Sequence, residues 1–187
     1  MFNYIKSALQ ILWEVVKVAL VSLAIILPIR YFLVQPFYVK GASMEPNFYD
    51  HDYLLIDEIS YRLREPDRGE VVVFHYPRDP SNYFIKRIVG LPNERLVVRD
   101  NQLYLSSTTS EPVEYSEPYL GEWIRTVGAL DVTLGANQYF VLGDNRSASL
   151  DSRSFGPIDR QAMVGRVWVR AWPLDRWAVY ASEPLVP

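Results

Sequence analysis

The sequence predicts one mostly-β domain preceded by a single transmembrane α-helix. Two observations predict this: one long apolar stretch near the N-terminus, and a series of short β-rich runs separated by turn-forming residues from Phe37 onward. At 187 residues, 49% of them hydrophobic, the chain is long enough for one domain plus an anchor and too short for two full domains beside a membrane span. We therefore expect a short tail and anchor over residues 1–36 and a β-rich domain over 37–187.

The apolar stretch runs from Val15 to Val34, twenty residues in which only Lys17 and Arg30 are charged. A helix of this length crosses a bilayer core of about 30 Å, and each cation can reach an opposite interface. A buried core helix is one alternative, because the uninterrupted run Val18 to Ile29 is only twelve residues long. A cleaved signal peptide is another, although no small-x-small cleavage site follows at the right distance. The span is the favoured interpretation.

The charges around the span bear on its orientation. Lys6, Lys17 and the amino terminus lie on one side, and Arg30 and Lys40 lie toward the other. The positive-inside rule therefore gives a slight preference for a cytoplasmic N-terminus. The β-rich domain would then lie on the outer side of the membrane.

Six β-rich runs follow the anchor, separated by clusters of turn-forming residues. One of them contains Asp100-Asn101, two residues that tolerate a positive φ, which predicts a hairpin with these residues at its tip. Between Ser106 and Gly135 the composition shifts to Ser, Thr, Glu and Pro, so we interpret residues 106–135 as an insertion or lid, and 181–187 as a loose tail. The six runs are Tyr53–Ile59, Glu70–Tyr76, Tyr83–Val89, Arg95–Leu105, Gln138–Leu142 and Val164–Trp172.

Few side chains in this sequence can activate a nucleophile, because it has no Cys and only two His, His51 and His75. Neither His has a second His at ligand spacing, so we assign no metal and expect no cofactor. A serine activated by a lysine is then the economical interpretation. Ser43 lies nine residues after Val34, hence at most roughly 32 Å from the membrane end of the chain. Its chemistry would occur near the bilayer surface.

Lys86 is the candidate base. Side chains alternate along a strand, so Phe84 and Ile88 share its face and give its ammonium apolar neighbours. Serving as a base at neutral pH requires its pKa to fall by about 3 units, and burial can supply a shift of that size. An ordinary lysine at a strand edge is the alternative.

A third group of polar residues fills the eleven positions from Gly143 to Arg153, GDNRSASLDSR, directly after a predicted strand. A charged, solvated turn is one interpretation. The alternation of Asp and Arg instead suits a fixed network of bidentate ion pairs that could shape a site and hold a hydroxyl near Lys86. The net charge of −3 and the scattered cations argue against nucleic acid as a partner.

Four motifs occur in order along the chain, and in order and wording they resemble the sequence boxes of type I signal peptidase, the leader peptidase family with a Ser/Lys dyad. The resemblance runs from the anchor to about Val169, apart from the predicted insertion. The motifs are Ser43-Met44-Glu45-Pro46, Arg68 to Phe74, Tyr83 to Pro92, and Gly143 to Arg153.

The resemblance implies a signal-peptidase/LexA-like antiparallel β catalytic domain that removes N-terminal signal peptides from exported preproteins, with Ser43 as nucleophile and neutral Lys86 as general base. Ser149 matches the hydroxyl that positions the lysine. The partners it implies are preprotein signal peptides and the lipid bilayer, and the oligomeric state is left open. Residues matching the ion pairs that shape the site are Asp144, Arg146, Asp151 and Arg153, with Arg87 a further partner, and those that would bind the extended substrate are Phe37, Val39, Gly41, Tyr83 and Ile85.

One position departs from part of the family. Some members carry a Ser two residues before the nucleophile, whose hydroxyl helps to stabilise the oxyanion, but here that residue is Gly41. The Ser43 backbone N–H would have to serve, with a water or another amide, and losing one donor costs about 3 kcal/mol of transition-state stabilisation. Other members also have Gly here, so inactivity does not follow.

Two other functions remain open from the sequence. A catalytically inactive, membrane-anchored β-domain that binds exported proteins would keep Ser43 and Lys86 only for folding. A self-cleaving repressor would share the Ser/Lys chemistry on a similar fold, but the anchor and the lack of a DNA-binding helical region argue against it. Cleavage of a preprotein in trans distinguishes a signal peptidase from both.

Overall fold

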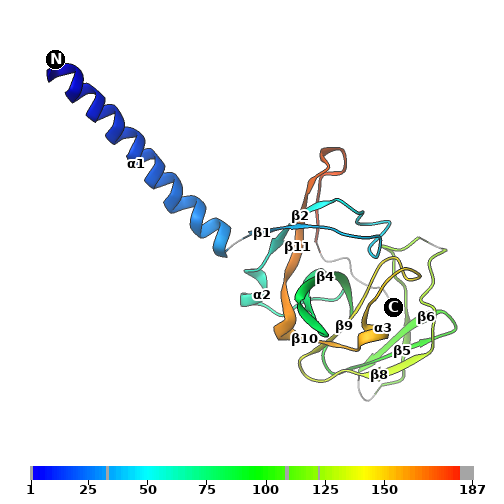
Figure 1. The fold of residues 1–187 in the computed structure, drawn as a ribbon. Coiled ribbons are helices and arrows are strands. Elements are labelled where there is room, and N and C mark those ends of the chain that lie inside the picture. The colour runs from blue at the N-terminus through cyan, green and yellow to red at the C-terminus, as the bar shows by residue number, and fades with distance from the viewer. Residues whose placement is uncertain (1, 33, 108–109, 122, 182–187) are drawn as a thin grey trace.

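The computed structural model describes residues 2–32, 34–107, 110–121 and 123–181. Its N-terminal helix α1 (Phe2–Phe32) extends away from a β-rich domain formed by the rest of the chain (Figure 1). Among the described helices, α1 alone contains a window long and apolar enough to cross a bilayer, Gln10–Leu27, and none of that window is buried against the domain. The alternative of a buried core helix therefore does not hold.

The predicted span extends too far at its C-terminal end. We predicted a span up to Val34, but α1 ends at Phe32, and Val34 begins β1 (Val34–Tyr38), where it pairs with Asp57 of β2 (Tyr53–Asp57). Apolar residues suit a membrane helix and a strand equally well, so the apolar run does not mark the boundary. The sheet therefore begins before residue 37.

The larger sheet of the described residues has eight strands. Its order is β1-β2-β11-β3-β4-β9-β10, with β12 also paired to β11, and the pairs are antiparallel. Strands β2, β3, β4, β9 and β11 overlap predicted runs, as expected from their Val, Ile, Phe and Tyr content. The remaining strands are β3 (Val71–Tyr76), β4 (Asp79–Gly90), β9 (Gln138–Leu142), β10 (Ile158–Asp159), β11 (Met163–Trp172) and β12 (Ala178–Val179).

A second sheet of four strands contains the predicted hairpin. Strand β5 (Glu94–Arg99) pairs with β6 (Gln102–Ser107), and φ is +52° at Asp100 and +60° at Asn101 at the tip. The stretch predicted as an insertion supplies β7 (Val113–Tyr115) and β8 (Leu130–Thr133), which complete the order β7-β6-β5-β8. Its described residues do not line the cleft discussed below, so they do not form a lid over it.

Four short helices connect these strands. They are α2 (Ser60–Leu63), α3 (Ser152–Phe155) and the 3₁₀ turns η1 (Arg160–Ala162) and η2 (Leu174–Arg176). Asp151 is the N-cap residue of α3, and its carboxylate caps the helix by accepting the Arg153 N–H. Of the predicted tail 181–187, residues 182–187 lie outside the described residues.

Strands β4 and β9 carry the core from one sheet to the other. Ile88 and Val141 pack in a buried cluster with Val72 and Phe74, while Val89 and Leu142 pack with the second sheet. A third buried cluster, around Met44 and Phe48, lies beneath the chain between β1 and β2. The ends of β4 and β9 are therefore held by buried packing on both faces. This packing gives rigid support to the side chains that project from these strand ends.

Candidate active site

Lys86 lies in β4 at the point where the neighbouring strand β9 ends. Arg87 pairs with Leu142, the last residue of β9, so the chain leaves the sheet at Gly143 beside Lys86. On its other side Lys86 pairs with Val72 of β3. Its Nζ lies 5.5 Å from the centre of the Phe84 ring, on the face that strand alternation predicts. The side chain is thus held in an apolar setting, and the residue is only 4% exposed.

Ser43 lies in the segment between β1 and β2, and two hydrogen bonds from main-chain N–H groups hold the start of this segment against the turn before β2. The Val39 N–H donates to the Asp52 carbonyl at 2.9 Å, and the Gly41 N–H donates to Asp50 Oδ1 at 2.8 Å. Gly41 has φ +87°, in the left-handed region that favours glycine. These contacts set the path of the chain that leads to Ser43.

The loop after β9 holds the main chain of Ser43. Gly143 packs so closely that an added Cβ would lie 2.4 Å from the Ser43 carbonyl oxygen and 2.2 Å from Ser149 Oγ, so only glycine fits. Asn145 donates its backbone N–H to the Ser43 carbonyl at 3.1 Å and its side-chain amide to the Ala42 carbonyl at 3.0 Å. Strand β4 and this loop therefore bring Ser43 and Lys86 together.

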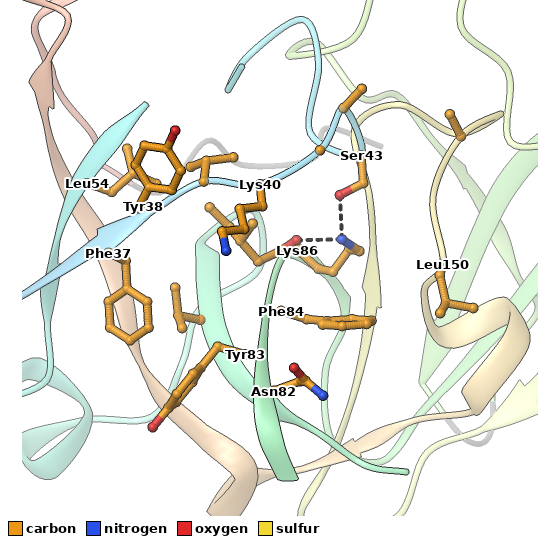
Figure 2. Close-up of a pocket in the computed structure, with 16 residues that line it drawn as sticks. Phe37, Tyr38, Lys40, Ser43, Leu54, Asn82, Tyr83, Phe84, Lys86 and Leu150 are labelled. Carbon is orange, nitrogen blue, oxygen red and sulfur yellow. Dashed lines mark hydrogen bonds between the residues drawn. The ribbon is translucent and has the colours of Figure 1, made fainter. Parts of the chain in front are cut away.

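The Lys86 amine contacts the Ser43 hydroxyl directly. Lys86 Nζ lies 2.7 Å from Ser43 Oγ and donates to the Ile85 carbonyl, also at 2.7 Å (Figure 2). Burial lowers the pKa of Lys86 to about 8, against the opposing effect of the Asp151 and Asp144 carboxylates, which raise it. A neutral amine is thus accessible near physiological pH, and in that state Nζ can accept the hydroxyl proton.

An apolar cleft of about 490 Å³ opens beside this pair. Figure 2 shows the Phe37 and Tyr83 rings next to each other on one side of it, and their centres lie 5.2 Å apart in an edge-to-face contact. The cleft also contacts Ser43, Lys86, Lys40 and Leu150. All five residues predicted to bind substrate line it: Phe37, Val39, Gly41, Tyr83 and Ile85.

Two of the predicted acidic residues form buried bidentate pairs with arginines. Asp144 accepts hydrogen bonds from Arg87 Nε and Nη2 at 2.9 and 2.7 Å. Asp151 accepts from Arg153 Nε and Nη2 at 2.9 and 2.8 Å and from the Gly143 N–H at 3.1 Å. Burial alone would raise the pKa of Asp151, but the Arg153 guanidinium and these hydrogen bonds hold it below its usual range. Both carboxylates are therefore held in fixed positions near Lys86.

Arg146 pairs with neither aspartate. Its guanidinium binds Glu117, from the stretch predicted as an insertion, so the segment that connects β7 to β8 contributes to the polar network. Burial alone would lower the pKa of Arg146, but the Glu117 carboxylate keeps it raised.

The Ser149 hydroxyl is buried beside Gly143 and makes no hydrogen bond to Lys86. It lies close enough to the Asp151 carboxylate to help lower the pKa of that group. The role predicted for Ser149 as the hydroxyl that positions the lysine stays a prediction.

Sequence reasoning missed three residues that support the site. Asn145 holds the Ser43 carbonyl, Asn47 donates its amide to Asp144 Oδ2 at 2.8 Å, and Glu117 binds Arg146. Asn145 lies inside a motif that was already singled out, so its position offered a signal. Asn47 and Glu117 lie outside the motifs that carried the interpretation, and their roles arise only from tertiary contacts.

The site combines a serine hydroxyl in contact with a buried lysine, a lowered pKa of that lysine, and an apolar cleft beside both on an antiparallel β domain. These are features of a serine peptidase that uses lysine as its base. Comparison with known proteins gives the family. Residues 12–172 match the model of the family described as "Signal peptidase, peptidase S26", and the chain belongs to this family.

Relatives of known name are similar to this chain over most of their length. The chain is 37% identical over 176 residues to "Probable signal peptidase I-2" of Synechocystis sp. (91% of this chain, 78% of the relative). It is 34% identical over 180 residues to "Signal peptidase I" of Leptolyngbya laminosa (92% and 86%) and 30% identical over 185 residues to "Signal peptidase IB" of Staphylococcus aureus strain COL (90% and 93%). The crystal structure of a signal peptidase I from Enterococcus faecalis V583 is 28% identical and covers 55% of this chain and 97% of its own, with a TM-score of 0.46.

Family and relatives confirm the predicted class: the protein is a serine endopeptidase of the signal peptidase I type. The predicted mostly-β fold with one apolar N-terminal helix is also confirmed. That helix fits membrane anchoring.

Proposed function

We propose that the protein cleaves signal peptides from exported preproteins at an active site in which Ser43 is the nucleophile and Lys86 the general base. The 2.7 Å contact between Lys86 Nζ and Ser43 Oγ carries this proposal. The burial of Lys86 supports it, because the same burial that lowers the pKa of the amine makes it a usable base.

In the first step, neutral Lys86 accepts the Ser43 proton while Oγ attacks the carbonyl carbon of the scissile bond. The tetrahedral intermediate collapses, the protonated lysine gives its proton to the leaving amine, and an ester joins Ser43 to the signal peptide. Water, deprotonated by Lys86, then hydrolyses the ester and restores both side chains.

The developing oxyanion would be stabilised by the Ser43 N–H, which makes no hydrogen bond within the described residues. Gly41 offers no side-chain donor, and its own N–H is used by Asp50. A second donor would have to be a water or another amide. We therefore assign the Ser43 N–H as the first oxyanion donor.

The substrate lies extended in the cleft, between Phe37 to Gly41 on one side and Tyr83 to Ile85 on the other. Phe37 and Val39 line shallow apolar pockets, which suit small side chains. Their presence among the residues that line the cleft supports this arrangement.

The remaining polar residues hold the dyad in place. Asp144 and Asp151 fix their arginine partners, and Arg146 and Arg153 brace the loop after β9. Ser149 is the remaining hydroxyl beside Gly143, and we assign it to orienting Lys86 once substrate fills the cleft. Its oxygen is buried and meets the distance and angle of a hydrogen bond with no group of the described residues, which supports this role.

We further propose a single-pass topology with a cytoplasmic N-terminus and the catalytic domain on the outer (periplasmic, extracellular or luminal) side, in contact with the lipid bilayer. The slight excess of positive charge toward the N-terminal end of the helix, from Lys6, Lys17 and the amino terminus, supports this orientation. It places the cleft on the side where exported preproteins emerge.

Incubating the purified protein with a candidate preprotein, followed by mass spectrometry of the products, tests the function. One cut that releases the mature protein is expected. Intact preprotein after incubation with an enzyme that is folded by thermal melting would contradict the proposal.

A further inference from the structure

Glu117 is the centre of a buried polar cluster on the side of the second sheet. Its Oε2 accepts from Arg146 Nη1 at 2.6 Å, and its Oε1 accepts from Arg146 Nη2 and from the Tyr119 hydroxyl. The Thr126 hydroxyl accepts from Arg146 Nη1 and donates to Glu117 at 3.4 Å. The side chains are 1% exposed at Arg146 and 10% at Glu117, so this pair is shielded from water.

Arg146 passes this restraint to the nucleophile. Its Nε donates to the Gly143 carbonyl at 3.0 Å, and its own carbonyl accepts from Arg153 Nη2 at 2.7 Å. Gly143 in turn packs against the Ser43 carbonyl oxygen, with no room for a Cβ between them. A shift of Gly143 would therefore displace Ser43.

Tyr119, two residues after Glu117, adds a second link to the polar network beside Ser43 and Lys86. The Tyr119 carbonyl accepts from the Asn47 amide at 2.9 Å, and that amide also donates to Asp144. The Tyr119 ring centre lies 3.9 Å from the Arg87 guanidinium carbon, which pairs with Asp144. The segment 117–119 thus contacts the polar network at two places: Glu117 binds Arg146, and Tyr119 contacts Asn47 and Arg87.

We propose that Glu117 is a positioning residue for the Ser43–Lys86 pair, acting from the segment between β7 and β8 through Arg146 and Gly143. The inference rests on the proposed dyad. Replacing its carboxylate by an amide would leave the buried Arg146 charge without its bidentate partner. Asp144 is the other carboxylate that acts on Arg146, so the guanidinium would turn toward it and compete with Arg87.

This rearrangement has a consequence for Lys86. The charged groups that act on its amine are Asp151 and Asp144, both from the loop after β9, and Lys40 lines the same cleft. Asp144 raises the pKa of Lys86, so an arginine drawn to Asp144 would weaken that effect. The pKa of Lys86 would fall, and the acid side of the pH–rate profile would move to lower pH.

The experiment compares full-length Glu117→Gln with full-length Glu114→Gln, using one preprotein. Glu114 is an exposed residue of β7 in the same stretch of chain, bonded to Gln102, and is the matched control. For Glu117→Gln we expect kcat to fall about tenfold or more, which corresponds to one lost charge-assisted interaction, with KM little changed. The inflection of the pH–rate profile should move to lower pH. Glu114→Gln should match the wild type in both.

Two results would overturn the proposal. One is a wild-type kcat and pH profile in Glu117→Gln. The other is a loss of activity that only follows the loss of folded protein, with the inflection unmoved, since that would make Glu117 a purely structural residue. If Glu117→Gln does not fold, Glu117→Asp serves instead: its shorter carboxylate should lower kcat with the inflection unmoved, and a full wild-type kcat there would overturn the proposal.

A double variant tests the route through Arg146. If Glu117 acts through Arg146, adding Glu117→Gln to Arg146→Gln should cost no further activity, whereas additive losses would refute the route. Failure of the dyad itself is distinguishable, because it would show as cleavage retained in Ser43→Ala, whatever the behaviour of the Glu117 variants.

Discussion

Lys86 Nζ lies 2.7 Å from Ser43 Oγ, although 43 positions separate the two residues in the chain. Lys86 is fixed by its pairing with β3, and Ser43 is fixed by the loop that leaves β9 beside it. The contact therefore depends on strand register rather than on local sequence. Changes that move that register should affect the chemistry before they affect the fold.

The pKa of Lys86 predicts how the rate of cleavage depends on pH. The lysine must be neutral to act as a base, so kcat/KM should rise through an apparent pKa of about 8. A pH–rate profile with one preprotein measures this. A profile still climbing at pH 10 without an inflection would contradict the assignment of Lys86 as the base.

The same shift predicts how stability depends on pH. Burial lowers the pKa of Lys86 in the folded protein, so the unfolded chain binds more protons between about pH 8 and the ordinary lysine value of 10.5. The contribution of this group to the free energy of unfolding should therefore rise by roughly 3 kcal/mol across that window. Below the window it should be constant. Denaturant unfolding of wild type and Lys86→Met at pH 8 and pH 10.5 measures the difference. An equal response of both proteins to pH would rule out a shifted lysine.

Gly143→Ala should abolish most of the activity. Its Cβ would lie 2.4 Å from the Ser43 carbonyl oxygen, so either the loop or the nucleophile must move. A displacement of this size is expected to lower kcat about a hundredfold. Gly135→Ala is the matched control, because its Cβ would meet only the flexible Gln138 side chain, at 3.3 Å. Similar kcat values for the two variants would show that the close approach of Gly143 does not matter for catalysis.

The cleft predicts the pattern of side chains accepted around the cleaved bond. Alternate residues of an extended substrate face the same wall, so the residue at the scissile bond and the one two positions before it would enter the pockets beside Phe37 and Val39. Replacing Ala by Phe at either position should lower kcat/KM about a hundredfold, while changes at the middle position should matter little. A preprotein series varied at these three positions measures this. Comparable cleavage of Phe and Ala at the scissile position would show that the pockets are wrongly assigned.

Removing the anchor should separate delivery from chemistry. Because Val34 already pairs in the sheet, a truncation that starts at residue 33 keeps β1 intact. We expect the truncated protein to cut short peptides at the wild-type rate and liposome-bound preprotein more slowly, since tethering raises the effective concentration at the surface. Equal rates of both proteins on liposome-bound preprotein would refute a role of the anchor in delivery.

Much of this arrangement could be predicted from local sequence signals. Apolar length predicted the helix, strand-forming residues predicted β3, β4, β9 and β11, and Asp100-Asn101 predicted the hairpin tip. The four ordered motifs predicted the family. In each case the signal is contained in a few neighbouring residues.

The features that the sequence did not predict depend on contacts between distant segments. The end of α1 was misplaced because apolar residues suit both a helix and β1. Glu117 was missed because it lies in a stretch whose Ser, Thr, Glu and Pro content is typical of a loop. Its partner Arg146 is 29 positions away in the chain. Tertiary contacts bring such residues together, and the amino-acid composition of a stretch does not predict those contacts.

The rate at which Lys86→Ala cleaves a preprotein tests the central claim most directly. The variant should cleave at the background rate from pH 6 to pH 10, like Ser43→Ala, while its thermal melting still shows a folded domain, because removing the base removes the mechanism. Lys86→Arg should also be inactive, since a guanidinium stays protonated throughout this range. Cleavage by folded Lys86→Ala at a rate near that of the wild type would contradict the assignment of Lys86 as the general base.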